Sequence, residues 1–155
     1  MLSINRLGNL GRLANQMFQY ASLKGIATNR GYSFSIPPKD AFGAQDELVS
    51  QSDVTIYDVF KNIENNHIGF QNNKTLWERM HHFDEELFVN CPDNVDLVGY
   101  FQTEKYFKHI EDEIREDFTF SKEITEMCKE LYNEVVDGES ISLHIRRGDY
   151  TVNPN

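Results

Sequence analysis

The residues with the clearest chemical potential cluster near the end of the sequence, in the segment ISLHIRRGDY. They are His144, Arg146, Arg147, Gly148 and Asp149. A guanidinium group is planar and recognises phosphate through paired hydrogen bonds, so two adjacent arginines favour a site for an anion. Two plainer interpretations stay open for single members of the set. One is an ion pair between an arginine and Asp149, and the other is a histidine hydrogen-bonded to the backbone.

The segment before the arginines alternates between apolar and polar side chains. The apolar positions are Ile141, Leu143 and Ile145. This period of two predicts a strand over residues 140–145 with one buried face. Ligands of open parallel sheets bind beyond the carboxyl ends of strands, which is where the arginines would then lie.

A second candidate is the segment GRLANQMFQYA, which spans Gly11–Ala21. A glycine before a helix lets the backbone approach a ligand closely, and the helix start offers unpaired N–H groups at its positive end. Asn15 and Gln16 follow Gly11 and Arg12 in the first turn, where we expect their side-chain amides to point outward. The segment matches neither the dinucleotide fingerprint nor the P-loop, so a chance match stays an alternative.

The remaining candidates predict no metal site. His81 and His82 are adjacent, so they cannot share one helix face as ligands. The stretch Asp84–Glu86 is interpreted as a solvated helix end. Cys91 and Cys128 are far apart and lack the spacing of metal ligands, which predicts two free thiols. The sequence also has no Asp-x-Asp pair that would hold a divalent metal.

The elements that must position these residues begin with a strand, a helix and a second strand. The patterns predict a strand over 2–7, a glycine-bearing turn over 8–11, a mostly buried helix over 13–30 and a strand over 32–36. A strand–helix–strand order of this kind is typical of a parallel α/β sheet.

The second half of the chain predicts three more helices and one strand. Thr75 with Glu78 suggests a capping box for a short helix. A strand is expected over 95–101, and helices over 103–116 and 121–135. The apolar stripes of the last two helices are interpreted as core. In the final helix the stripe is Ile124, Met127, Cys128, Leu131 and Val135.

Charge and hydropathy narrow the class of protein. The chain has 155 residues, a hydrophobic fraction of 39% and a formal net charge of -10. These values are typical of an acidic globular domain. An acidic surface argues against a nucleic-acid partner. No apolar run is long enough to span a bilayer, and the N-terminal segment lacks the pattern of a secretory signal. We therefore expect a cytoplasmic protein and leave peripheral membrane association open.

Three segments, taken together and in this order, resemble the α-1,2-fucosyltransferases of glycosyltransferase family 11. They are GRLANQMFQYA, GYFQTEKYFKHIEDEIREDFTF and SLHIRRGDY. The resemblance implies a GT-B-like architecture of two Rossmann-like lobes, of which this chain holds the N-terminal α/β lobe with its parallel sheet. It also implies transfer of fucose from GDP-fucose to the 2-hydroxyl of a galactoside. The reaction would invert the sugar carbon and need no metal or other cofactor.

The resemblance also assigns roles to residues. It implies that Arg146 contacts the donor diphosphate, where a guanidinium would stabilise the charge on departing GDP. The catalytic set is then Arg146, His144 and Asn15. The donor-binding set is Gly11, Arg12, Asn15, Gln16, His144, Arg146, Arg147, Gly148 and Asp149. The expected partners are GDP-fucose and a glycan acceptor that ends in galactose.

Length gives the expected domain organisation. Members of the family are longer, which predicts that residues 1–139 form the N-terminal lobe. Residues 140–155 would then supply the first strand and the phosphate-contacting loop of a second GDP-binding lobe, missing from a truncated chain. Two alternatives stay open: an inactive nucleotide- or carbohydrate-binding module left by truncation, and an α/β domain without a ligand.

Overall fold

The computed structural model describes residues 1–41, 54–64, 74–136, 138–139 and 141–145. The chain divides into two compact units, Met1–Ser121 and Lys122–Asn155. The predicted lobe boundary between residues 139 and 140 stays a prediction.

The first unit is built on a four-stranded sheet in which all neighbouring strands run parallel. In the spatial order β2-β1-β4-β3, the strands are β2 (Phe34–Ser35), β1 (Leu2–Ser3), β4 (Val95–Val98) and β3 (Thr75–Trp77). The two central strands are buried along their whole length. This arrangement confirms the predicted α/β fold with a Rossmann-like parallel sheet.

The predicted helix that begins at Thr75 is wrong, because these residues form the edge strand β3. A β-branched residue followed by leucine and tryptophan suits a strand, and β4 provides the backbone partner. Glu78, expected to complete a capping box, instead accepts hydrogen bonds from the N–H groups of Tyr100 and Phe101. The capping-box pattern therefore matched by chance.

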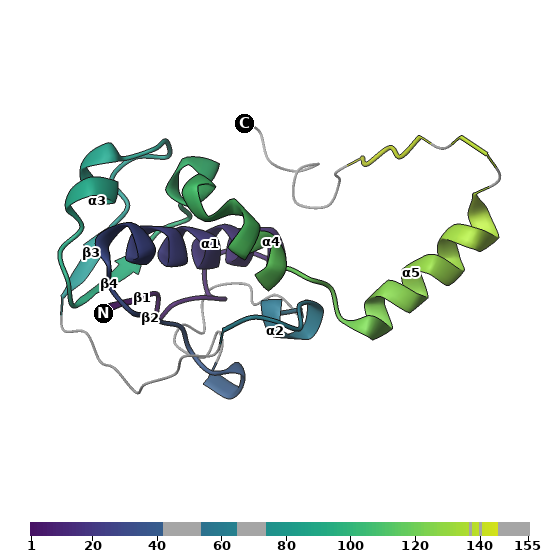
Figure 1. Cartoon of the computed structure of the whole chain (residues 1–155), viewed down its shortest axis with the longest axis horizontal. Helices are drawn as coiled ribbons and strands as arrows, with labels where there is room; N and C mark the ends of the chain where they lie inside the picture. The colour runs from purple at the N-terminus through teal and green to yellow at the C-terminus, as the bar shows by residue number, and fades with distance from the viewer. Residues whose placement is uncertain (42–53, 65–73, 137, 140, 146–155) are drawn as a thin grey trace, which may run out of the picture. The chain divides into compact units, whose positions relative to one another are not determined.

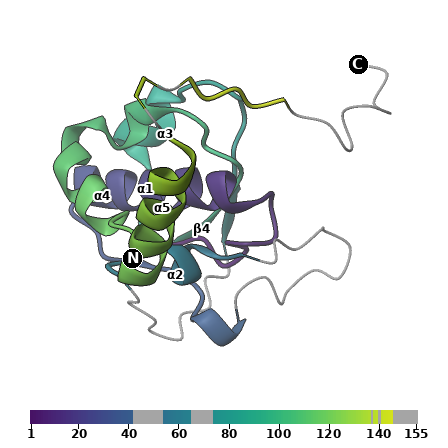
Figure 2. The same ribbon diagram turned by 90° about the vertical axis from the view of Figure 1, so that its right-hand side faces the viewer.

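Helix α1 (Leu13–Arg30) confirms the predicted long helix between the first two strands. It ends at Gly31, whose left-handed φ of 67° lets its N–H group reach the carbonyls of Ala27 and Thr28. Figures 1 and 2 show α1 between the sheet and the segment that carries α4. Because both sides are covered, α1 is mostly buried, as predicted.

Short helices complete the first unit. They are η1 (Lys39–Ala41), α2 (Ile56–Val59), α3 (Glu85–Asn90), η2 (Glu104–Tyr106), η3 (Lys108–Ile110) and α4 (Glu111–Asp117). The helix predicted over 103–116 is thus broken into η2, η3 and α4, with Phe107 outside the helical region at φ -131°. The core that joins these elements to α1 includes Tyr20, Leu23, Ile26, Phe101, Tyr106 and Ile114.

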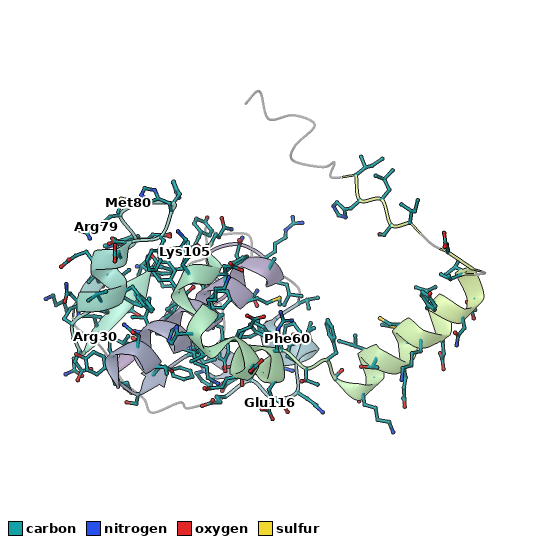
Figure 3. The ribbon with its side chains drawn as sticks, turned by 45° about the horizontal axis from the view of Figure 1, so that its top comes forward. Arg30, Phe60, Arg79, Met80, Lys105 and Glu116 are labelled. Atoms are coloured by element: carbon teal, nitrogen blue, oxygen red, sulfur yellow. The ribbon has the colours of Figure 1, made fainter. Side chains whose placement is uncertain are left out.

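The stretch that begins at Asp84 is not a fully solvated helix end. Asp84 is buried and caps α3, where its side chain accepts a hydrogen bond from the N–H group of Leu87. Arg79, labelled in Figure 3, forms an ion pair with it at 2.8 Å. Burial works to raise the pKa of Asp84, but the hydrogen bonds from Leu87 and Arg79 outweigh it and lower that pKa. The charge therefore anchors α3.

In the second unit, α5 (Lys122–Val135) confirms the predicted helix but not its interpretation as core. None of its residues is buried. Met127, Leu131 and Val135 of the apolar stripe are 62%, 59% and 73% exposed. A stripe at helical spacing predicts which side could be buried, whereas burial itself needs a partner.

The predicted strand over 140–145 is wrong for the residues that the structure describes, 141–145. Ile141, Leu143 and Ile145 are 98%, 81% and 71% exposed. A strand is completed by hydrogen bonds to a neighbouring strand, and no described residue pairs with this segment. Alternation alone could not supply that neighbour.

Candidate functional site

The carboxyl ends of β1 and β4 bring two loops together at one edge of the sheet. The first loop leads from β1 to α1, and the second spans residues 99–103 after β4. Gln19 of α1 joins them, because its Nε2 donates hydrogen bonds to the carbonyls of Leu10 and Gly99, each at 3.1 Å. This is the edge at which open parallel sheets bind ligands.

The first loop closes around Asn15. Gly11 has a left-handed φ of 85°, and a Cβ atom added there would lie 1.8 Å from Asn15 Nδ2. Only glycine therefore leaves room for the Asn15 side chain to fold back over the loop. From this position Asn15 Oδ1 accepts a hydrogen bond from Nε2 of Gln102 at 2.5 Å. The half-buried amide of Asn15, in the first turn of α1, thus meets the exposed amide of Gln102 at this edge of the sheet.

Gln16 does not point outward as expected. Its side chain is 1% exposed. Its Oε1 accepts a hydrogen bond from the N–H group of Ile56 at 3.1 Å, and its Nε2 donates to the carbonyl of Val54 at 3.4 Å. Gln16 therefore ties α1 to the start of α2, and the first-turn amide that remains available to a ligand is that of Asn15.

The start of α1 carries no negative charge of its own. Arg12 occupies the N-cap position without a side-chain cap, and the first turn contains no acidic residue. The first backbone N–H groups of a helix lack partners within the helix, so they attract an anion. The exposed guanidinium of Arg12 is next to these N–H groups in sequence. The start of α1 therefore suits a phosphate.

The second loop is held in a conformation that its residues rarely adopt. Phe101 has a φ of 50° although it is bulky, and its side chain is fully buried. Its N–H group donates to Glu78 at 3.1 Å, and its carbonyl accepts from the Ser22 hydroxyl at 3.1 Å. Such backbone strain persists only where surrounding contacts fix it. Those contacts direct the next residue, Gln102, toward Asn15.

A buried carboxylate supports the first loop from below. Asp96 of β4 accepts hydrogen bonds from the Ser3 hydroxyl at 3.0 Å and from the N–H group of Asn5 at 2.8 Å. Burial raises the pKa of Asp96 even though these hydrogen bonds and the charge of Arg6 oppose it. Both hydrogen bonds are to Oδ1 and come from residues at and just after the end of β1. Asp96 therefore fixes where the first loop leaves the sheet.

The other predicted site residues lie in the second unit. His144 is exposed there, in the irregular segment 141–145. Arg146, Arg147, Gly148 and Asp149 lie outside the described residues. The structure therefore brings together Gly11, Arg12 and Asn15 of the predicted set, and the roles of the second-unit residues stay predictions.

Sequence reasoning missed Gln19 and Gln102, and it assigned Glu78 to a capping box instead of to the second loop. Gln19 and Gln102 both lie in segments that carry the family resemblance, and Gln102 follows a predicted strand, so position alone could have marked it. Nothing local could have marked Gln19, because its two partners are carbonyls on loops far apart in sequence.

Neither a metal site nor a membrane span is found within the described ranges. No group of three or more His, Cys, Asp or Glu side chains there could hold a metal ion. Each helix among those residues is too short or too polar to cross a bilayer. Cys91 and Cys128 are both free thiols, as predicted.

A cavity of about 350 Å³ lies beside α1, on the side of α4. Its walls are mainly apolar, with Met17, Phe18, Phe107 and Phe118 among the lining residues. Because few polar groups face it, the cavity offers little chemistry for a sugar nucleotide, and the polar edge of the sheet is the better candidate site.

Comparison with known proteins identifies the relatives of this chain. It is 25% identical to the alpha-1,2-colitosyltransferase of Escherichia coli, over 92% of this chain and 54% of that protein. It is 30% identical to the galactoside alpha-(1,2)-fucosyltransferase 2 of Sus scrofa, over 100% of this chain and 44% of the relative. For the protein of the same name from Bos taurus the identity is 29%, over 100% and 43%.

The chain thus spans about half the length of these relatives. No solved structure gives a significant match. The model of the family described as glycosyl transferase family 11 matches residues 3–155, which is nearly the whole chain. The chain belongs to glycosyl transferase family 11.

Proposed function

We propose that this protein transfers fucose from GDP-fucose to the 2-hydroxyl of a galactoside. The observation that carries the proposal is the family match over residues 3–155. The names of the Sus scrofa and Bos taurus relatives support the donor sugar, the linkage and the galactoside. The geometry agrees, because polar side chains and a helix start meet at the carboxyl edge of a parallel sheet, where such ligands bind.

The proposed reaction forms one bond and breaks one. The galactoside 2-hydroxyl oxygen attacks the sugar carbon of fucose from the side opposite GDP, which inverts that carbon. The bond from this carbon to the diphosphate breaks, and its electron pair leaves with GDP. The hydroxyl proton passes to a base to which no residue is assigned.

The leaving diphosphate gains negative charge as the bond breaks. We assign its stabilisation to the guanidinium of Arg146, with Arg147 beside it in sequence as a second cation. A positioned guanidinium stabilises this charge without a metal ion. We therefore propose a metal-independent reaction, and a cytoplasmic location in keeping with a nucleotide-sugar donor.

The identity of the sugar is tested by a second donor. The Escherichia coli relative is named for colitose, whereas the Sus scrofa and Bos taurus relatives are named for fucose. Comparing GDP-fucose with GDP-colitose on one galactoside acceptor assigns the donor by the larger kcat/KM.

The decisive experiment measures transfer to lactose from GDP-fucose in the presence of a chelator. Arg146→Ala should lower kcat about a hundredfold, the scale for removal of one group that stabilises the transition state. Arg146→Lys should be nearly as slow, because lysine keeps the charge but loses the planar fork. Arg115→Ala, which removes an exposed guanidinium paired with Glu111, is the matched control and should transfer at the parent rate.

Three results would change the proposal. Parent-like transfer by Arg146→Ala would remove Arg146 from the mechanism. Loss of all transfer in chelator, restored by a divalent metal, would contradict the metal-independent mechanism. Calorimetric binding of GDP-fucose without transfer would favour the inactive binding module instead.

A further inference from the structure

We propose that Asn15 and Gln102 together form a subsite for a sugar hydroxyl, and that buried Gln19 is the positioning residue that holds the two amides in register. The inference rests on the proposed function and deepens it, since it names the substrate group that the carboxyl edge of the sheet recognises. It adds two residues, Gln102 and Gln19, to those expected from the sequence.

The amide pair has the hydrogen-bonding capacity that a hydroxyl needs. Asn15 Oδ1 is occupied by Gln102 Nε2, and this contact fixes how both amides are oriented. Among the described residues, Asn15 Nδ2 and Gln102 Oε1 have no other partner. One is a donor and the other is an acceptor, so they can bind both the oxygen and the proton of one hydroxyl or of two neighbouring hydroxyls.

The amide pair itself favours a neutral group over a phosphate. Both amides are neutral, and the nearby carboxylate of Glu78 is fully engaged by the N–H groups of Tyr100 and Phe101. The guanidinium groups assigned to the diphosphate, Arg146 and Arg147, belong to another segment, and among the described residues no hydrogen bond joins Arg12 to either amide. A phosphate is bound most strongly by a positively charged group, which the amide pair does not supply. A sugar hydroxyl is neutral and needs no positive charge.

Gln19 makes the subsite possible because it fixes both loops at once. Its side chain is 0% exposed, and its Nε2 reaches the carbonyl of Leu10 on one loop and of Gly99 on the other. These two anchor points lie five residues before Asn15 and three residues before Gln102. Removing the Gln19 amide takes the donor away from two part-buried carbonyls and lets the loops move apart.

The buried side-chain oxygen of Gln19 also indicates that this residue has a positioning role. Its Oε1 is buried and has no hydrogen-bond partner in the described part of the chain. Leaving a buried polar atom unpaired costs about 1–3 kcal/mol. In this orientation Oε1 stays unpaired while Nε2 binds the carbonyls of both loops. We infer that the bridge between the loops determines the orientation of the side chain.

The test couples variants of the subsite to substrates that lack single hydroxyls. KM and kcat are measured for lactose, for lactosides deoxygenated at one galactose position at a time other than the reacting 2-position, and for GDP-fucose. Gln102→Ala should raise KM about three- to tenfold for the substrate whose hydroxyl it binds, the scale of one neutral hydrogen bond. With the analogue that lacks this hydroxyl, parent and variant should have equal KM values.

The two possible sources of the hydroxyl give different results. If the acceptor supplies it, KM for lactose rises and one deoxylactoside cancels the effect. If fucose supplies it, KM for GDP-fucose rises and GDP-colitose, which lacks one hydroxyl of fucose, reduces the effect. Either pattern supports the subsite and assigns its ligand.

Gln19→Leu separates positioning from general stability. It should unfold at lower urea than the parent, but it should also lose the same hydroxyl-specific discrimination as Gln102→Ala. A residue with only a structural role would change stability without changing discrimination between lactose and its deoxy analogues. Glu113→Ala, an exposed change on α4, should leave both quantities unchanged.

The failure of this inference is distinguishable from failure of the proposed function. If the parent transfers fucose and Gln102→Ala keeps every KM value, the subsite is wrong and the function stands. If the parent binds lactose or GDP-fucose in saturation-transfer NMR without transfer, loss of that binding in Gln102→Ala still supports the subsite. If the parent binds neither compound, both proposals are overturned.

Discussion

Helices α1 and α5 show how differently two apolar stripes can be used. Both were expected to belong to the core. In α1 ten of eighteen residues are buried, including several polar ones, whereas no residue of α5 is buried although its stripe is regular. The difference lies in the surroundings, because α1 lies between a sheet and the segment from η2 to α4. An apolar stripe thus predicts a helix and the side of it that can be buried. Whether that side is buried depends on another element packing against it.

The buried polar residues of α1 explain why this helix carries the candidate site. Gln16, Gln19 and Ser22 all bond to backbone groups of other segments. Each fixes a loop or a helix start that has no regular backbone partner of its own. The α1 helix therefore organises the carboxyl edge of the sheet through its polar side chains, while its apolar ones supply the packing.

The largest effect on stability is expected from Lys24→Ala in α1. Lys24 Nζ lies 2.6 Å from Asp117 and 2.7 Å from Glu64, and both Lys24 and Asp117 are buried. Burial alone would lower the pKa of Lys24, but its hydrogen bonds to Asp117 and Glu64 outweigh burial and raise it. Breaking a buried ion pair by removing one partner costs about 3–5 kcal/mol.

Urea unfolding measures this loss. The contribution of Lys24 is present below the ordinary lysine pKa and is lost only as the pH rises through the raised pKa of the folded state. The difference between parent and Lys24→Ala should therefore be constant from about pH 6 to pH 9. The double variant Lys24→Met, Asp117→Leu should recover part of the stability, and a parent-like Lys24→Ala would show that α1 is not held by this network.

A smaller loss is expected from Gly25→Ala in the same helix. Alanine favours a helix over glycine by about 1 kcal/mol. Here, however, the new Cβ would lie 2.1 Å from the carbonyl oxygen of Tyr106 and 2.8 Å from Cα of Phe107, which are backbone atoms. We expect a net loss of about 1–3 kcal/mol in urea unfolding, the range for overpacking. Thr28→Ala, at an exposed position of α1, is the control and should not destabilise.

The third prediction concerns α2, which Gln16 joins to α1. Hydrogen bonds from Lys39 and Thr55 lower the pKa of Asp58 to about 2. The ionised Asp58 carboxylate stabilises the fold at every pH above the ordinary aspartate pKa. This stabilisation is lost as the pH falls toward about 2. Asp58→Asn should therefore be less stable than the parent at neutral pH, and this difference should shrink as the pH falls from about 4 to 2. An unchanged acid profile would contradict the assignment.

Local signals predicted the parts of the fold that local contacts determine. The glycine turn, α1 and its end at Gly31 follow from residue types within a few positions of each other. The parallel sheet followed from the order of the elements. For the site, the same signals identified Gly11 and Asn15, because a glycine before a helix start is a local pattern.

What the sequence could not predict depends on contacts between distant segments. Thr75–Trp77 became a strand because β4 lies beside it. Gln16 turned inward because α2 offers an N–H group that no pattern near Gln16 reveals. Gln102 reaches Asn15 only because Glu78 and Ser22 hold the unusual backbone of Phe101. In each case the deciding partner lies tens of residues away in sequence.

The smallest effect is expected from Leu131→Ala in α5, and it tests the comparison most directly. A buried leucine in a core costs about 2–5 kcal/mol when replaced by alanine. Leu131 is 59% exposed, and alanine has the higher helix propensity, so the free energy of unfolding should change by less than about 0.5 kcal/mol. Leu23→Ala, at a fully buried position of α1, is the matched control and should show the full cost of a core leucine. Equal losses for the two variants, measured by urea unfolding of the whole chain, would mean that α5 buries its stripe as α1 does. The distinction drawn between the two helices would then be wrong.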